Sequence, residues 1–308
     1  MKILVIGGSY FFGRVFVMQA AKEHEITVAN RGTYSMEEFG VRQMICDRRD
    51  VSVWQACRED YDVIVDFCAY EKGDVAKMLQ NLPGNAGQYI FVSTVDVYRR
   101  GTGKVKDETA PLEQRALSGD AGAYIAGKVA LEQEAAEECA KRGMACTVLR
   151  PAILYGPFNY APREAAYIQR MVQDCILPHI TGAAGRFQFT YIGDAAKAVS
   201  RCLGNEKTYG QAYNLCGDEI LTYDLFADEL KRAADRNGIT DGETEIREIA
   251  VPWEHAMAQG IPLPFPVTEE ETELCSNEKS KRDLGMEYTL LTEGMAKTYR
   301  AFRGVYRA

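Results

Sequence analysis

Short apolar segments alternate with helical segments through the first half of the 308-residue chain, and this alternation restricts the fold most strongly. The strand-like segments comprise residues 3–6, 25–29, 41–46, 61–68, 88–93 and 145–149. Helical spacing of apolar residues occurs at 11–22 and at 123–142. Strands that are apolar on both faces belong to parallel sheets covered by helices on both sides. Because crossovers between parallel strands are right-handed, we expect an α/β fold with a doubly wound parallel sheet.

A glycine-rich turn joins the first strand to the first helix, and its residues are Gly7, Gly8, Ser9, Tyr10, Phe11, Phe12 and Gly13. In such a turn Gly7 can bend sharply, Gly8 lets the backbone approach a pyrophosphate, and Gly13 permits close helix–strand packing. The pyrophosphate would lie at the helix N-terminus, where free N–H groups favour an anion. We therefore predict that this turn binds a dinucleotide; the alternative is a strand-to-helix turn with incidental glycines.

The ends of the following strands supply further cofactor candidates. Asn30 and Arg31 follow the second strand, and no acid is present there to repel a 2′-phosphate. The sequence therefore favours NADP over NAD, although Arg31 could also be a solvated loop charge. Asp47, after the third strand, could contact adenine or begin a helix. The remaining candidate cofactor contacts are Cys68, Ala69, Tyr70, Ser93 and Pro151.

Tyr124 and Lys128 lie four residues apart in the predicted helix 123–142, and therefore on the same face. The ammonium of Lys128 could lower the phenol pKa toward the range of a usable base. In a chain with 17 tyrosines this spacing could also be accidental. Position favours the first interpretation, because the fifth strand ends in Ser93 and Thr94 at the carboxyl edge of the sheet. We predict that a hydroxyl from this strand end, the Tyr124 phenol and the Lys128 ammonium converge on one substrate oxygen.

These motifs together resemble the extended short-chain dehydrogenase/reductase family, in its NAD-dependent epimerase/dehydratase group. The resemblance covers nearly the whole chain and continues in Leu149-Arg150-Pro151, Tyr155-Gly156-Pro157, Phe189-x-Tyr191-x-x-Asp194 and residues 281–285. The turn, with Tyr10 in place of the usual middle glycine, looks like an atypical branch that includes chloroplast stem-loop RNA-binding relatives.

The resemblance implies Tyr124 as the acid/base, Lys128 as its partner and Thr94 in the family's Ser/Thr position. The implied activity is that of an NAD(P)-dependent epimerase or oxidoreductase. Its small-molecule substrate would carry a sugar-like hydroxyl or keto group and could be a sugar or a nucleotide-sugar. The alternative function is an RNA-binding or cofactor-sensing protein on a retained Rossmann scaffold.

Two departures from the family pattern concern the substrate. Nucleotide-sugar epimerases carry an arginine where this chain has Phe187, with Arg186 one place away. Sugar dehydratases follow the threonine with Asp-Glu, whereas Val95 and Asp96 stand here, which argues against dehydration. Asp96 could act as an acid or base, or be structural. Candidates for binding an anionic substrate group, or else surface residues, are Arg163, Arg170 and Arg186.

The regular alternation ends near Pro151, and shorter mixed segments follow. We expect residues 1–155 to form a dinucleotide-binding Rossmann domain, to which the chain returns at 189–215. Residues 156–308 would form a smaller, interleaved substrate-binding lobe. The length fits two units at roughly 150 residues per domain. The apolar side of helix 123–142 could join a partner's helices in a four-helix homodimer, as in the family, or be core.

Composition excludes several other classes. A net charge of −8 disfavours non-specific nucleic-acid binding, so we interpret Arg48-Arg49 and Arg99-Arg100 as solvated loop charge. Nine scattered cysteines without Cys-x-x-Cys spacing indicate reduced thiols and a cytoplasmic protein. Three histidines without ligand spacing predict no metal site. No apolar run is long enough to span a bilayer.

Overall fold

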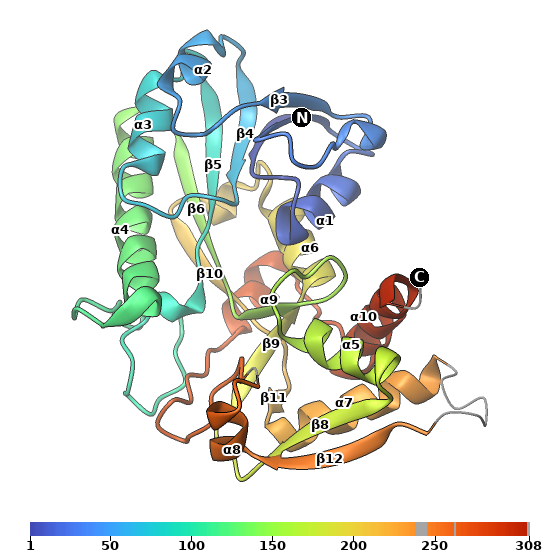
Figure 1. Cartoon of the computed structure of the whole chain (residues 1–308). Coiled ribbons are helices and arrows are strands. Elements are labelled where there is room, and N and C mark those ends of the chain that lie inside the picture. Colours follow the sequence, from blue (N-terminus) through green and yellow to red (C-terminus); the bar gives the residue numbers. More distant parts are fainter. Residues whose placement is uncertain (238–244, 262, 307–308) are drawn as a thin grey trace.

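The computed structural model describes residues 1–237, 245–261 and 263–306. A seven-stranded sheet, in which every pair of neighbouring strands is parallel, forms its larger part (Figure 1). The strand order is β10-β6-β5-β4-β1-β2-β3. These strands are β1 (Lys2–Ile6), β2 (Glu25–Asn30), β3 (Arg42–Ile45), β4 (Tyr61–Asp66), β5 (Ala86–Val92), β6 (Ala145–Pro151) and β10 (Gln211–Leu215). The predicted doubly wound fold is confirmed.

Helices cover both faces of this sheet. One face packs against α1 (Phe11–Ala20) and α6 (Ile192–Cys202). The other packs against α2 (Val51–Ala56), α3 (Asp74–Asn81) and α4 (Gly119–Lys141). Alternate side chains of β1 enter different layers, because successive residues of a strand point to opposite faces. Both layers are apolar, which explains why the strands read as continuous apolar runs.

Helix α4 buries its apolar side against the sheet. Leu131, Ala135 and Cys139 belong to the hydrophobic core on that face, and each is at most 1% exposed. This side of the helix is therefore core, the second of the two roles considered for it. A homodimer through α4 would have to use the remaining face and stays a prediction.

A second body of small sheets and helices packs below the main sheet in Figure 1. Its strands are β7 (Ile153–Tyr155), β8 (Ile176–Thr181), β9 (Phe187–Tyr191), β11 (Ile220–Leu221) and β12 (Arg247–Pro252). Its helices are α5 (Glu164–Gln173), α7 (Tyr223–Arg236), α8 (Trp253–Ala258) and α10 (Leu291–Tyr306), while α9 (Glu278–Leu284) packs near α6 and β10. A cluster of aromatic side chains fills its core. The boundary between the two predicted domains stays a prediction.

The strand order reverses at β1, which lies between β2 and β4. In open parallel sheets, ligands bind beside the carboxyl ends of the strands at such a reversal. The turn after β1 and the segments after β4 and β5 all begin at this edge. Within the described ranges, no helix is long and apolar enough to cross a membrane, and no group of three or more His, Cys, Asp or Glu could hold a metal ion.

Candidate active site

A cavity of about 1510 Å³ opens at the carboxyl edge of the main sheet and extends to the second body. Sites for one drug-sized ligand usually measure about 300–1,000 Å³, so this cavity has room for more than one such molecule. Most of the predicted site residues line it: Gly7, Ser9, Tyr10, Phe11, Phe12, Gly13, Asn30, Arg31, Asp47, Cys68, Tyr70, Ser93, Thr94, Tyr124, Lys128 and Pro151. Gly8 and Ala69 are not among its lining residues.

The glycine-rich turn brings backbone close to backbone. Gly7 has a φ of 85°, which favours glycine, and a β-carbon at Gly13 would lie 2.7 Å from the Gly7 carbonyl oxygen. Helix α1 begins there with no side-chain cap and no acid in its first turn, which suits an anion. A β-carbon at Gly8 would meet Val5 at 2.8 Å and Val17 at 3.0 Å, so core packing also requires a glycine here, and its backbone approach to a pyrophosphate stays a prediction.

Asn30 closes β2 with one unused donor. Its Oδ1 accepts hydrogen bonds from the Gly32 N–H at 2.8 Å and from Gln43 Nε2 at 2.9 Å. Its Nδ2 is buried and has no hydrogen-bond partner among the described residues. Beside it, Arg31 is exposed and forms no ion pair with any described residue. The Asp47 carboxylate accepts a hydrogen bond from the Arg49 N–H at 2.9 Å within the loop after β3.

Arg48 is buried, which corrects its interpretation as solvated charge. Its guanidinium donates to both carboxylate oxygens of Asp66, at 2.8 and 2.9 Å. Asp66 is fully buried and also accepts from the Tyr89 hydroxyl at 2.7 Å. The Arg48 charge holds the pKa of Asp66 below its usual value, against the effect of burial. Arg49 fits the original interpretation, since it is exposed and pairs with Glu71.

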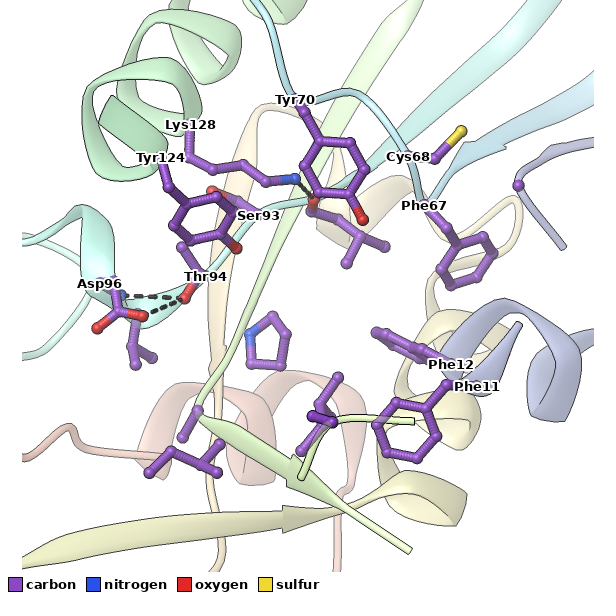
Figure 2. A pocket seen from close by; sticks show the side chains of 18 of the residues that line it. Phe11, Phe12, Phe67, Cys68, Tyr70, Ser93, Thr94, Asp96, Tyr124 and Lys128 are labelled. Atoms are coloured by element: carbon purple, nitrogen blue, oxygen red, sulfur yellow. Dashed lines mark hydrogen bonds between the residues drawn. The ribbon is translucent and has the colours of Figure 1, made fainter. Parts of the chain in front are cut away.

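The candidate catalytic side chains gather on one wall of the cavity (Figure 2). Lys128, which is 2% exposed, donates to the backbone carbonyls of Ala69 at 2.9 Å and Val92 at 3.0 Å. Its Nζ lies 4.8 Å from the centre of the Tyr70 ring. The Tyr124 phenol faces the same cavity. Ala69 does not line the cavity, and its carbonyl contributes by binding the Lys128 ammonium.

Thr94 and Asp96 lie on the other side of the Tyr124 phenol. Thr94 Oγ1 donates to the Asp96 carboxylate at 3.2 Å and accepts from the Asp96 N–H at 3.2 Å. A hydrogen bond with Thr94 also acts on the Tyr124 phenol and lowers its pKa. The neighbouring Ser93 Oγ is buried and has no partner among the described residues.

Burial dominates the protonation of both candidate catalytic groups. It raises the pKa of Tyr124 to about 12, and the negative charge of Asp96 adds to this effect. Burial lowers the pKa of Lys128 to about 8, against the attraction of Asp66. The Tyr124 pKa is therefore raised overall and not brought into the range of a usable base, whereas a lowering effect of Lys128, whose Nζ lies 6.0 Å from the centre of the Tyr124 ring, stays a prediction.

The irregular chain after β7 supplies residues that motifs did not indicate. Tyr160 is 72% exposed, lines the cavity, and has its ring centre 6.1 Å from that of Tyr10. Of the three arginines considered for an anionic substrate, Arg163 lines the cavity, whereas Arg170 and Arg186 do not. No motif in the sequence distinguished Arg163 from the other two.

Comparisons with known proteins find one family model and one relative that match this chain. The model of the NAD dependent epimerase/dehydratase family matches residues 75–216. A chloroplast stem-loop binding protein of 41 kDa from Arabidopsis thaliana is 28% identical over 99% of this chain and 81% of its own length.

Solved structures share the fold over nearly the whole chain. A UDP-glucose 4-epimerase from Thermotoga maritima, solved with UDP-glucose, has a TM-score of 0.77 at 18% identity and covers 99% of both chains. A UDP-glucuronic acid 4-epimerase from Bacillus cereus, solved with UDP-glucuronic acid and NAD, has a TM-score of 0.72 at 18% identity and covers 99% of this chain and 100% of its own. The chain is thus similar to the NAD dependent epimerase/dehydratase family over residues 75–216, and it shares the fold of these solved structures over nearly its whole length.

Proposed function

We propose that this protein is an NAD(P)-dependent epimerase or oxidoreductase acting on a hydroxyl or keto group of a sugar-like substrate. One observation carries the proposal: Thr94, Tyr124 and Lys128 line a single cavity together with the glycine-rich turn. The match to the NAD dependent epimerase/dehydratase family model over residues 75–216 adds the expectation of dinucleotide chemistry. The relatives solved with NAD have the same fold and support a cofactor in the corresponding cleft.

Unused polar groups support the fit of the cofactor. Ser93 Oγ and Asn30 Nδ2 are buried without partners among the described residues, and a buried polar group costs free energy until a ligand satisfies it. At the adenosine end, Asn30 and Arg31 present donors and no acid. These residues would hold a 2′-phosphate, so we propose NADP as the preferred cofactor. The helix α1 N-terminus would hold the pyrophosphate.

The chain's own residues supply the acid–base chemistry. A bound nicotinamide would exchange a hydride with the substrate carbon. Thr94 would position the substrate oxygen, and Tyr124 would exchange its proton. With its pKa raised to about 12, Tyr124 is protonated at neutral pH and acts first as an acid toward a keto oxygen. Lys128 places a positive charge beneath this site while its carbonyl contacts hold it in place.

Mass spectrometry of small molecules released from the purified protein tests the proposal most directly. We expect a nicotinamide dinucleotide, and titration of emptied protein should show tighter binding of NADPH than of NADH. Replacing Arg31 with Met should reduce that difference without affecting NADH. Tyr124→Phe should retain the dinucleotide and lose turnover. A protein that binds neither dinucleotide would contradict the proposal.

The name of the Arabidopsis relative supports a second candidate, the binding of structured nucleic acid. The net charge of −8 and the burial of Arg48 argue against it. A gel shift with stem-loop RNA at low salt distinguishes the two. A salt-sensitive shift that persists in Tyr124→Phe would favour nucleic-acid binding. No shift at low salt would eliminate it.

A further inference from the structure

The positive charges along the cavity are mostly neutralised by the protein itself. Eight Lys and Arg side chains line it. Five of them pair with carboxylates, namely Arg48, Arg49, Arg100, Lys106 and Arg115, with Asp66, Glu71, Asp96, Glu273 and Glu113 in that order. Arg31, Lys128 and Arg163 form no ion pair with any residue that the structure describes. Arg31 lies at the proposed adenosine end and Lys128 binds backbone carbonyls, so Arg163 is the uncompensated guanidinium on the substrate side.

Arg163 is held on a fixed loop that faces the candidate catalytic group. It directly precedes α5, and its Nη1 donates to the Leu154 carbonyl at 3.4 Å. The next residue, Glu164, is fully buried and accepts from the Gly156 N–H at 3.0 Å and from Asn159 Nδ2 at 2.9 Å, which fixes the loop. The charge of Arg163 acts on the Tyr124 phenol and lowers its pKa. A partly buried guanidinium without a carboxylate suits an anion supplied by a ligand.

The wall on which nucleotide-sugar epimerases carry an arginine is apolar in this chain. Phe187 stands there, is 2% exposed, and stacks on Phe265 with ring centres 4.4 Å apart. The Tyr223 hydroxyl fixes that partner by donating to the Phe265 carbonyl at 3.0 Å and accepting from its N–H at 3.2 Å. The neighbouring Arg186 is outside the cavity, 4.0 Å from Glu269. A diphosphate would therefore meet stacked aromatic rings at this wall.

We propose that the substrate is a compact sugar acid without a nucleotide, whose carboxylate binds Arg163 while its reacting carbon lies between Thr94 and Tyr124. This inference rests on the proposed function and names its substrate class. A single guanidinium matches one carboxylate through two parallel hydrogen bonds. A phosphate monoester carries a charge of about −1.5 to −2 and would need a second cation, which the ion-paired residues do not supply.

Calorimetric titration of the full-length protein loaded with NADP⁺ tests the inference. The ligands are D-gluconate and D-glucuronate, with D-glucose, glucose 6-phosphate and UDP-glucose for comparison. We expect a sugar acid to bind most tightly. Arg163→Met should weaken that binding about 10- to 100-fold, as expected for a hydrogen-bonded charge pair, and leave the weak binding of glucose unchanged. Arg163→Lys should recover part of the loss.

Arg170→Met is the matched control, because it removes an exposed arginine from the neighbouring helix α5, outside the cavity. It should bind the sugar acid like the unaltered protein. The inference would be overturned if UDP-glucose or glucose 6-phosphate bound most tightly. It would also be overturned if Arg163→Met bound the sugar acid as tightly as the unaltered protein, or if neither D-gluconate nor D-glucuronate bound. Dinucleotide binding is measured before any sugar is added. If the protein binds the dinucleotide but its binding of the sugar acid does not depend on Arg163, this inference alone is removed. If the protein does not bind the dinucleotide, the proposed function is overturned as well.

Discussion

At the residue scale, the buried ammonium of Lys128 should make stability depend on pH. Burial lowers its pKa from 10.5 to about 8, so the unfolded chain binds this proton more tightly than the folded protein does. Stability then rises with pH between these two values, because the folded protein escapes the cost of a buried charge. Below about pH 8 the cost is fully present. The displacement corresponds to about 3 kcal/mol.

We therefore expect the free energy of unfolding of the unaltered protein to rise relative to that of Lys128→Met by about 2–3 kcal/mol between pH 7 and pH 10. Urea unfolding of both proteins across this range measures the difference, and other titrating groups cancel in it. Lys77→Met, which changes an exposed lysine of α3, should run parallel to the unaltered protein. If the stability curve of Lys128→Met also ran parallel to that of the unaltered protein, the pKa of Lys128 in the folded protein would be close to its ordinary value.

Asp96 should set the pH dependence of the proposed reaction through Tyr124. Its negative charge raises the phenol pKa, so Asp96→Asn should lower that pKa. The acid limb of kcat/KM in the oxidative direction should then move to lower pH, by about half a unit, because the Asp96 carboxylate is partly solvated. Glu137→Gln, on the outer surface of α4, should leave the limb in place. A limb that moves to higher pH would contradict this role.

The positions of site residues were predictable where a local motif contains them. They were less predictable where the site depends on contacts between segments that are distant in the sequence. Thr94, Tyr124 and Lys128 follow from a strand end and a helix spacing, and the structure places all three on one cavity. The burial of Arg48, in the turn after β3, depends on Asp66, which lies 18 residues away at the end of β4. A run of two arginines contains no sign of that partner. The unpaired state of Arg163 likewise follows only from the positions of the carboxylates around the cavity.

At the element scale, the inner strands β1, β2, β4 and β5 of the main sheet were predictable because both of their faces are buried. β8 and β12 were not, since they form a separate two-stranded sheet and β12 is exposed over most of its length. Its partner lies about 70 residues earlier in the chain, as in the pairing of Arg247 with Ile176. A short, exposed strand has neither the apolar run nor the alternation on which such predictions depend.

The close approach of α1 to β1 gives a prediction for Gly13. A β-carbon there would lie 2.7 Å from the Gly7 carbonyl oxygen and 2.9 Å from the Gly8 α-carbon, and backbone cannot move aside easily. Gly13→Ala should therefore open the turn, lower the free energy of unfolding by about 1–3 kcal/mol, and weaken dinucleotide binding at least tenfold. Urea unfolding and a binding titration measure the two effects.

Gly304→Ala is the matched control for Gly13→Ala. Gly304 lies in α10 and is exposed, and a β-carbon added there would meet no described atom within 4 Å. The same substitution should stabilise the protein there by about 0.5–1 kcal/mol, because alanine favours helix. Dinucleotide binding should not change. Equal effects of the two substitutions would show that helix propensity, rather than the turn, governs the result at Gly13.

At the scale of the whole molecule, aromatic side chains from both bodies meet over the glycine-rich turn. Tyr10 belongs to the turn, and Tyr34 contacts it edge-on with ring centres 4.7 Å apart. Tyr160 reaches the same place from the loop after β7, 6.1 Å from Tyr10 and 6.3 Å from Phe11. The cavity beneath is thus bordered by a contact between segments about 150 residues apart in sequence.

A dinucleotide bound at the turn would lie against these rings, since Tyr10, Phe11 and Tyr160 all line the cavity. We expect Tyr160→Ala to raise the dissociation rate of NADPH about 3- to 10-fold, as the loss of an aromatic contact implies, with little change in the association rate. Stopped-flow fluorescence of NADPH measures both rates. Tyr209→Ala, which removes another exposed tyrosine away from the cavity, should change neither. If the dissociation rate stays the same in Tyr160→Ala, the aromatic contact does not retain the cofactor, and the turn and strand ends alone hold it.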